Sequence, residues 1–304
     1  MSAARILRVY LDDVPRARAE AGNFNIMNKI RAAFESKGYR VDFVKNSEAE
    51  RAKSVARRGY ALFHMDHPFH ARALTMRKAY FYPFWRIETS SQRWDWEIAK
   101  TPFDPSAVNR KAADAFFTSW RKRLFPGLGD VSRDGFVYIP LQGRLLEQRS
   151  FQSQSPLDMI RTTLAYDAER QVIVGLHPGE TYLPEERDAL KQLVDGAPRV
   201  QLSSQPMEGL LQRCDYVVTQ NSSVALNGFF LEKPAVLFAR IDFAHITANV
   251  HDLGPEAAIK NAPMLTPDYP GYLHWFLKET AINGGSKLVE DQILAAVRHH
   301  GWEV

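Results

Sequence analysis

The sequence has few of the features that would tie it to an oxidising compartment or to a membrane. Cys214 is the only cysteine, so no internal disulfide can form, which is usual for proteins of reducing compartments. Arg5 and Arg8 interrupt the N-terminal segment, which leaves no apolar core for a signal peptide. No run of about 18 apolar residues is present that could span a bilayer. We expect a cytoplasmic protein, at most peripheral to the inner membrane.

Several nucleotide-binding and catalytic motifs are also absent. The chain has no Gly-x-Gly-x-x-Gly, no Walker loop and no Gly-x-Ser-x-Gly, which argues against dinucleotide oxidoreductases, P-loop NTPases and α/β-hydrolases. A net charge of +4 with a pI of about 9.1 is too weak a positive balance to indicate nucleic-acid binding. That charge suits an anionic small substrate or loose contact with an anionic membrane surface.

Strand and helix patterns alternate along most of the 304 residues, of which 45% are hydrophobic. Apolar runs predict strands at 6–11, 41–44, 60–64, 79–87, 136–141, 171–176, 199–202, 216–219 and 235–238. Helical spacing and caps predict helices at 25–36, 47–58, 105–124, 184–194, 207–213, 222–231 and 287–299. The aromatic-rich stretch after residue 87 is expected to be a long loop over a cleft, up to residue 104.

Such alternation is typical of parallel βαβ units, and the length suits two domains of about 150 residues each. The polar segment 143–165 is rich in Gln, Ser and Arg, and we place the domain boundary there. The predicted fold is therefore α/β, with two Rossmann-like domains, 1–150 and 151–304, facing each other across a cleft.

Two polar motifs follow predicted strands in the second domain. His177-Pro178-Gly179 comes after the strand 171–176, and Asn221-Ser222-Ser223 comes after the strand 216–219 and opens a helix. Ligands of open α/β sheets bind beyond the carboxyl ends of the strands, where a helix N-terminus favours phosphate. An imidazole there can act as an acid, a base or a phosphate donor. A plain turn and a plain helix N-cap are the alternative interpretations. The motifs together favour a phosphate-bearing donor and a transferase.

Carboxylates and histidines elsewhere supply further candidates. The acidic candidates are Asp12, Asp13, Glu88, Glu147 and Asp242. Asp12 and Asp13 follow the first strand and would face the cleft to bind substrate, unless they only begin a helix. Arg86 and Glu88 lie two apart on a strand, so their side chains share a face, either as an ion pair or toward substrate.

The cluster of His64, His67 and His70 with Asp66 has a spacing that can bind zinc. No Cys, Asp or Glu completes a tetrahedral set, however, and Pro68 breaks any helix that would align the ligands. We expect no metal there, and interpret the segment as a loop that lines the cleft.

Four of these segments resemble the capsule polysaccharide biosynthesis proteins, which include the bacterial Kdo transferases of capsule assembly. The similarity lies in residues 136–142 (FVYIPLQ), 174–178 (VGLHP), 215–226 (DYVVTQNSSVAL) and the following Lys233-Pro234. Arg86-Ile87-Glu88 is similar to the Arg-x-Glu element of that family. The match covers about residues 135–240 and is thin before residue 80 and after residue 245.

The resemblance implies a GT-B glycosyltransferase that needs neither metal nor other cofactor. It implies a CMP-activated sugar such as CMP-Kdo as donor, and a glycan or glycolipid as acceptor in building a surface polysaccharide or glycolipid. By this resemblance the first domain takes the acceptor and the second binds the nucleotide sugar. His177, Ser222 and Ser223 would hold the nucleotide phosphate, Gln142 would belong to the donor site, and Glu88 would lie near the reacting centre.

One position departs from the family pattern. An Asp is expected four residues after Gln142, but that position is Leu146, followed by Glu147. Either Glu147 replaces the carboxylate, or the mechanism or the donor differs. The lysine often found before the His-Pro pair is also missing, with Leu176 there instead. Two alternatives therefore stay open: a catalytically inactive glycan- or nucleotide-binding scaffold, and a nucleotide-sugar epimerase.

Overall fold

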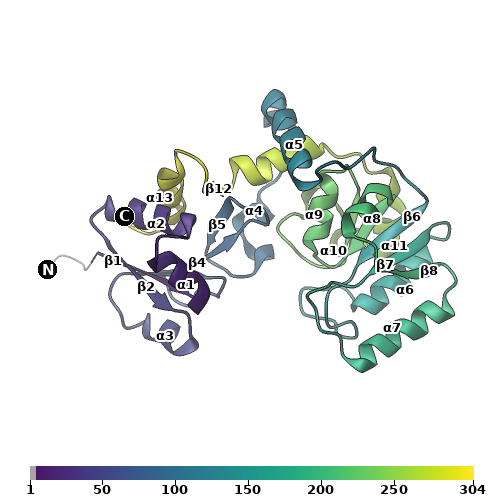
Figure 1. Cartoon of the computed structure of the whole chain (residues 1–304), viewed down its shortest axis with the longest axis horizontal. Helices are drawn as coiled ribbons and strands as arrows, with labels where there is room; N and C mark the ends of the chain where they lie inside the picture. Colours follow the sequence, from purple (N-terminus) through teal and green to yellow (C-terminus); the bar gives the residue numbers. More distant parts are fainter. Residues whose placement is uncertain (1–4) are drawn as a thin grey trace. The chain divides into compact units, whose positions relative to one another are not determined.

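The computed structural model describes residues 5–304, which form two compact units (Figure 1). Unit 1 contains the chain up to Thr101 together with Phe276–Val304, and unit 2 contains Pro102–Trp275. Within residues 5–304, no helix combines the length and the apolar character needed to cross a bilayer.

Unit 1 is built on a six-stranded sheet with the order β12-β5-β4-β3-β1-β2. Its strands are β1 (Ile6–Leu11), β2 (Arg40–Lys45), β3 (Tyr60–His64), β4 (Ala73–Lys78), β5 (Phe84–Glu88) and β12 (Ile282–Asn283). The first four pair in parallel, whereas β5 runs antiparallel to both β4 and β12. Its helices are α1 (Asp13–Glu20), α2 (Asn25–Glu35), α3 (Glu48–Lys53), α4 (Glu97–Lys100) and α13 (Val289–His299).

The core of unit 1 forms between this sheet and the two helices α2 and α13. Alternate residues of β1, such as Val9, are fully buried there, as are Ile30 on one helix and Ile293 on the other. Figure 1 shows the C-terminal helix α13 beside α2, although the two are far apart in sequence. Burial of these apolar faces explains why the last segment of the chain returns to unit 1.

Unit 2 contains a second six-stranded sheet, with the order β11-β10-β9-β6-β7-β8 and all pairs parallel. Its strands are β6 (Phe136–Pro140), β7 (Gln171–Gly175), β8 (Val200–Ser203), β9 (Tyr216–Thr219), β10 (Ala235–Leu237) and β11 (Ala248–Asn249). Its helices are α5 (Arg110–Leu124), α6 (Pro156–Tyr166), α7 (Pro184–Gly196), α8 (Met207–Arg213), α9 (Ser223–Phe229), α10 (Val250–Leu253), α11 (Pro255–Asn261) and α12 (Tyr269–Leu273). The central strands are nearly continuous apolar runs, as expected for a parallel sheet covered on both faces.

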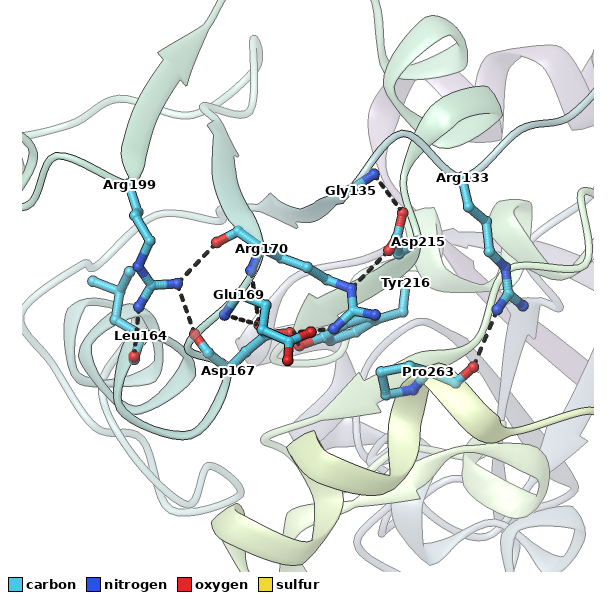
Figure 2. A network of polar contacts seen from close by, with 10 residues as sticks. All are labelled: Arg133, Gly135, Leu164, Asp167, Glu169, Arg170, Arg199, Asp215, Tyr216 and Pro263. Atoms are coloured by element: carbon cyan, nitrogen blue, oxygen red, sulfur yellow. Dashed lines mark hydrogen bonds and ion pairs between the residues drawn. The ribbon is translucent and has the colours of Figure 1, made fainter.

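An ionic network joins the amino ends of β6, β7 and β9 (Figure 2). Arg170, just before β7, binds Asp167 at 3.1 Å and Asp215 at 2.7 Å. Asp215, just before β9, also accepts a hydrogen bond from the Gly135 N–H at 2.9 Å, and the Tyr216 hydroxyl donates to Asp167 at 2.7 Å. The network lies at the opposite end of the strands from a ligand site at their carboxyl ends, so we assign it a structural role.

The division of the chain differs from the boundary predicted at residue 150. Strand β6 precedes that boundary but pairs with β7 and β9, so it belongs to unit 2. Residues 276–304 follow the boundary but belong to unit 1. The polar segment 143–165 is no linker, because it contains α6, whose apolar residues Leu157 and Ile160 are buried in the core of unit 2.

The strand predicted at 79–87 is also wrong in part. The chain instead forms the antiparallel pair β4 and β5, joined by a tight turn in which Tyr80 has a φ of 62°. Pro83 cannot donate to a central sheet ladder, so the strand begins only after it. Likewise, the helix predicted at 105–124 starts at Arg110, after a short 3₁₀ turn at Pro105–Ala107.

Candidate functional site

A cavity of about 520 Å³ opens in unit 2 beside the carboxyl ends of its central strands. Part of its lining comes from β6 and the end of β7, and the rest from the segments that follow β7, β8 and β9. The polar residues that line it are Tyr138, His177, Ser203, Ser204, Gln205, Glu208, Ser222, Ser223 and Asn227. The apolar ones include Pro140, Leu141, Leu176, Pro178, Pro206, Met207 and Val224. A concave cleft that combines apolar surface with convergent polar groups is typical of small-molecule sites, and here the polar groups are numerous.

His177 lies in the loop that leaves β7, and its ring is fixed by that loop. Its backbone N–H donates to the Tyr182 hydroxyl at 2.8 Å, and the Gly179 N–H donates to its Nδ1 at 3.1 Å. Because Nδ1 is an acceptor, the neutral ring carries its proton on Nε2. The side chain is exposed, so this Nε2–H group is available to a ligand.

Ser222 and Ser223 begin α9, directly after β9. Ser222 is buried and is the N-cap residue, since its Oγ accepts a hydrogen bond from the Val224 N–H at 3.2 Å. Ser223 is exposed, and both serines line the cavity. Strands β7 and β9 both flank β6, so their carboxyl ends bring His177 and the two serines to one cavity. Asn221 precedes them but does not line it.

The remaining residues proposed for the donor lie around this cavity. Pro178 lines it, and Gly179 contributes the hydrogen bond that orients His177. Gln142 follows β6 outside the lining, and no residue of 5–304 bonds its buried Oε1. Glu147 is exposed and forms an ion pair with Arg144 at 3.3 Å, so it does not reach the cavity.

The loop between β8 and α8 also lines the cavity, through Ser203 to Glu208. Sequence reasoning missed this loop, although it follows a predicted strand just as the His177 and Ser222 segments do. The rule that ligands bind beyond the carboxyl ends of parallel strands, if applied to β8 as well, would have identified this loop. Tyr138 was missed because it lies inside a strand, where sequence carries no sign of a ligand.

Arg86 and Glu88 line a different cavity, of about 330 Å³, within unit 1. Both are buried on β5. Arg86 donates to the carbonyl oxygens of Phe276 at 2.6 Å and Thr280 at 2.8 Å, so it fixes the start of the C-terminal segment. Glu88 lies 3.9 Å from His300, whose pKa is lowered by burial, and accepts a hydrogen bond from the Glu97 N–H at 3.4 Å.

Asp12 and Asp13 follow β1, at the carboxyl edge of the unit 1 sheet. The Asn46 amide donates to Asp12 at 2.9 Å and to Asp66 at 2.6 Å, which links the ends of β1, β2 and β3. Asp13 is exposed and pairs with Lys45 at 3.1 Å.

The histidines of the predicted cleft loop have separate environments. His67 accepts a hydrogen bond from the Ser91 N–H at 3.3 Å, and His70 lies 2.8 Å from the Ser54 hydroxyl. His64 is largely buried, and its burial lowers its pKa. Among residues 5–304, no group of three or more His, Cys, Asp or Glu side chains is placed to hold a metal ion.

No protein-family model matches the sequence, and no curated protein matches it. Among solved structures, a β-Kdo 2,7-transferase, KpsC of Thermosulfurimonas dismutans, is similar over 84% of this chain and 89% of its own, at 12% identity and a TM-score of 0.51. The chain has the GT-B fold. That outcome confirms the two-domain Rossmann-like architecture and the resemblance in fold to bacterial Kdo transferases.

Two other solved structures show a weaker similarity to this GT-B chain. The β-Kdo 2,4-transferase KpsC of T. dismutans matches 81% of this chain and 84% of its own, at 10% identity and a TM-score of 0.46. S. aureus MnaA, in a structure with UDP, matches 97% and 96%, at 10% identity and a TM-score of 0.38.

The cavity of unit 2 has the chemistry to hold an anion in this GT-B fold. It combines the Nε2–H of His177 with the hydroxyl and the backbone N–H of Ser223, the first residue of α9. Hydroxyl, imidazole and backbone N–H donors all bond phosphate oxygens. The apolar residues beside them offer surface to an uncharged part of the same ligand.

Proposed function

We propose that the protein is a metal-independent glycosyltransferase that uses a CMP-activated, Kdo-like sugar to build a surface polysaccharide or glycolipid in the cytoplasm. Unit 2 would bind the donor, and unit 1 would bind the glycan or glycolipid acceptor. The observation that carries the proposal is the convergence of His177, Ser222 and Ser223, from two separate loops, on one cavity at the carboxyl ends of the strands. These residues belong to the segments that resemble Kdo transferases.

The geometry supports a role for these groups in leaving-group departure. When the bond from the sugar to the CMP phosphate breaks, negative charge develops on the phosphate. The hydroxyl and backbone N–H of Ser223, with the Nε2–H of His177, would stabilise that charge as it forms. Asn221 and Gln142 would contribute through the position of their loops, because neither lines the cavity.

A carboxylate would accept the proton of the acceptor hydroxyl or attack the anomeric carbon. Glu88 and Glu147 are our candidates, with Arg86, Asp12 and Asp13 as acceptor-binding groups. A Glu88→Gln variant that loses turnover while it keeps its affinity for CMP would support a catalytic role for Glu88. The same comparison with Glu147→Gln decides whether Glu147 serves instead.

Isothermal titration with CMP tests the donor site. We expect wild-type protein to bind CMP, and the double variant His177→Ala with Ser222→Ala to bind about tenfold more weakly or worse, because charge-assisted hydrogen bonds are lost. Ser155→Ala is a matched control, since Ser155 caps α6 in the same way, accepting from the Asp158 N–H at 3.1 Å, but lies outside the cavity. Absence of CMP binding, or equal binding by the double variant, would remove the basis of the proposal.

The exposed position of Glu147 favours a second candidate, a nucleotide-binding scaffold without turnover. Its pairing with Arg144 leaves no carboxylate from the loop after β6 in the cavity. Purified protein that binds CMP but transfers no sugar from CMP-, UDP- or GDP-linked donors to any glycan acceptor would favour the scaffold. Transfer of a sugar would exclude it.

A further inference from the structure

Tyr138 is the one tyrosine that lines the unit 2 cavity within the described residues. It lies in the middle of β6, between Val137 and Ile139, which both point into the core on the other face of the sheet. Its own side chain therefore lies on the face where α8 and α9 border the cavity. Only 4% of Tyr138 is exposed, so the ring is packed and its position is fixed.

The hydroxyl of Tyr138 has no protein partner. No residue of 5–304 forms a hydrogen bond with it, although tyrosine hydroxyls of packed rings usually find one; its oxygen is not among the fully buried polar atoms, so it stays accessible from the cavity. Two other buried tyrosines of unit 2 follow that rule, since Tyr216 donates to Asp167 at 2.7 Å and Tyr182 accepts from the His177 N–H at 2.8 Å. The hydroxyl of Tyr269 also has no partner among the described residues, but Tyr269 does not line the cavity. The Tyr138 hydroxyl is thus a polar group directed at the cavity.

A glycine makes this position possible. A Cβ atom added at Gly175 would lie 3.1 Å from the Tyr138 hydroxyl oxygen and 3.2 Å from its Cε2. Both distances are tighter than ordinary carbon contacts. Gly175 is the last residue of β7, two positions before His177. The missing side chain therefore lets the tyrosine lie across the strand end, beneath the loop that carries the imidazole.

The cavity that Tyr138 lines has apolar walls as well as polar groups. Apolar side chains of Pro140, Leu176, Pro206, Met207 and Val224 line the same cavity. Apolar walls suit the flat ring of a nucleobase, with a small number of polar groups to fix its orientation. Burial raises the pKa of Tyr138 to about 12, so the hydroxyl keeps its proton at neutral pH and can both donate and accept.

We infer that Tyr138 binds the nucleobase of the donor through its hydroxyl, while His177, Ser222 and Ser223 bind the phosphate. This inference rests on the proposed function, which it extends from the phosphate to the rest of the nucleotide. It also accounts for the glycine at the end of β7, because a Cβ atom there would force the ring and its hydroxyl to shift.

The test compares Tyr138→Phe with wild type by isothermal titration, using CMP, cytidine and ribose 5-phosphate as separate probes. We expect the variant to bind CMP and cytidine about tenfold more weakly, as for one lost hydrogen bond to a buried group. Its affinity for ribose 5-phosphate should change much less. Its melting temperature should match the wild type, because the hydroxyl makes no bond within the protein.

Tyr216→Phe is the matched control, since it removes a hydroxyl from the same sheet at the opposite strand end. We expect it to lower the melting temperature, through loss of the bond to Asp167, and to leave the affinity for CMP unchanged. Gly175→Ala provides a second variant that keeps the tyrosine but displaces it. It should weaken binding of CMP and cytidine in the same direction as Tyr138→Phe.

The outcomes separate this inference from the proposed function. If wild type binds CMP and Tyr138→Phe binds CMP and cytidine equally well, the role of Tyr138 is overturned and the donor site stands. Equal losses for cytidine and ribose 5-phosphate would also overturn it, because the hydroxyl would then not act on the nucleobase, which ribose 5-phosphate lacks. If wild type binds none of the probes, both the proposed function and this inference fail.

Discussion

The buried carboxylate of Glu186 accepts a hydrogen bond from the Leu145 N–H at 2.5 Å. Its other oxygen accepts one from the Leu183 N–H at 2.8 Å, at the start of α7. A single side chain thereby joins the loop that follows β6 to the segment that follows the His177 loop. Glu180 adds to this packing, because its carboxylate lies against Gly143, where a Cβ would come within 2.6 Å of its Oε2.

We expect Glu186→Ala to lower the free energy of unfolding by about 2–3 kcal/mol, because two backbone N–H groups lose their acceptor. Urea unfolding measures this. Glu185→Ala is the control, since Glu185 lies exposed in the same helical turn and should change stability by less than about 0.5 kcal/mol. Equal effects of the two substitutions would contradict the role of Glu186.

The network of Figure 2 should make the free energy of unfolding depend on pH in the acidic range. Burial alone would raise the pKa of Asp167, but hydrogen bonds from the Arg170 N–H and the Tyr216 hydroxyl outweigh it and lower that pKa. A carboxylate with a lowered folded pKa contributes stability above its unfolded pKa, near 3.8, and loses it as the pH falls toward the folded value.

Asp167→Asn should therefore be less stable than wild type at pH 7, and the difference should shrink as the pH falls below about 4. Urea unfolding at a series of pH values measures it. Asp195→Asn, at an exposed ion pair on α7, should behave as wild type throughout. A difference between Asp167→Asn and wild type that stays constant across this range would exclude the linkage.

We assign the buried, charged side chain of Lys233 a role in holding the protein backbone in place, not in binding a ligand. Only 1% of it is exposed, and its Nζ donates to the carbonyl oxygens of Ser132 at 2.5 Å and Cys214 at 2.7 Å. We expect Lys233→Met to lower the free energy of unfolding by about 2 kcal/mol, because both acceptors lose their donor. Lys260→Met, at an exposed helical ion pair, is the matched control and should change it by at most about 0.5 kcal/mol. A Lys233→Met protein as stable as the control would refute this account.

The elements best predicted from sequence were short apolar runs with clear limits. The strands Ile6–Leu11, Tyr60–His64 and Tyr216–Thr219 have the predicted bounds. Helix α1 was not predicted, because Ala19 is its only buried residue. A single buried residue does not produce the repeat of apolar residues by which a helix is recognised in a sequence. Helix α6 was missed for another reason: its buried residues follow a polar loop, and polarity was interpreted as a domain boundary.

The candidate site was predictable where it depended on strand order and hidden where it depended on packing. Ligands of parallel sheets bind beyond the carboxyl ends of the strands, and this rule predicted that His177 and Ser222 meet at one edge of the sheet. Both residues line one cavity there, while their role toward a ligand stays a prediction. Tyr138 could not be found in that way. The features that single it out, a hydroxyl without a partner in residues 5–304 and the space above Gly175, are properties of the folded packing.

Hydrogen–deuterium exchange with and without CMP tests the central claim most directly, because it locates the nucleotide without altering the protein. We expect CMP to slow amide exchange in the segments that follow β7 and β9, around residues 177–180 and 222–226. Exchange near the ionic network at Asp167 and Asp215 should not change. Protection confined to unit 1, or none at saturating CMP, would contradict a donor site in unit 2.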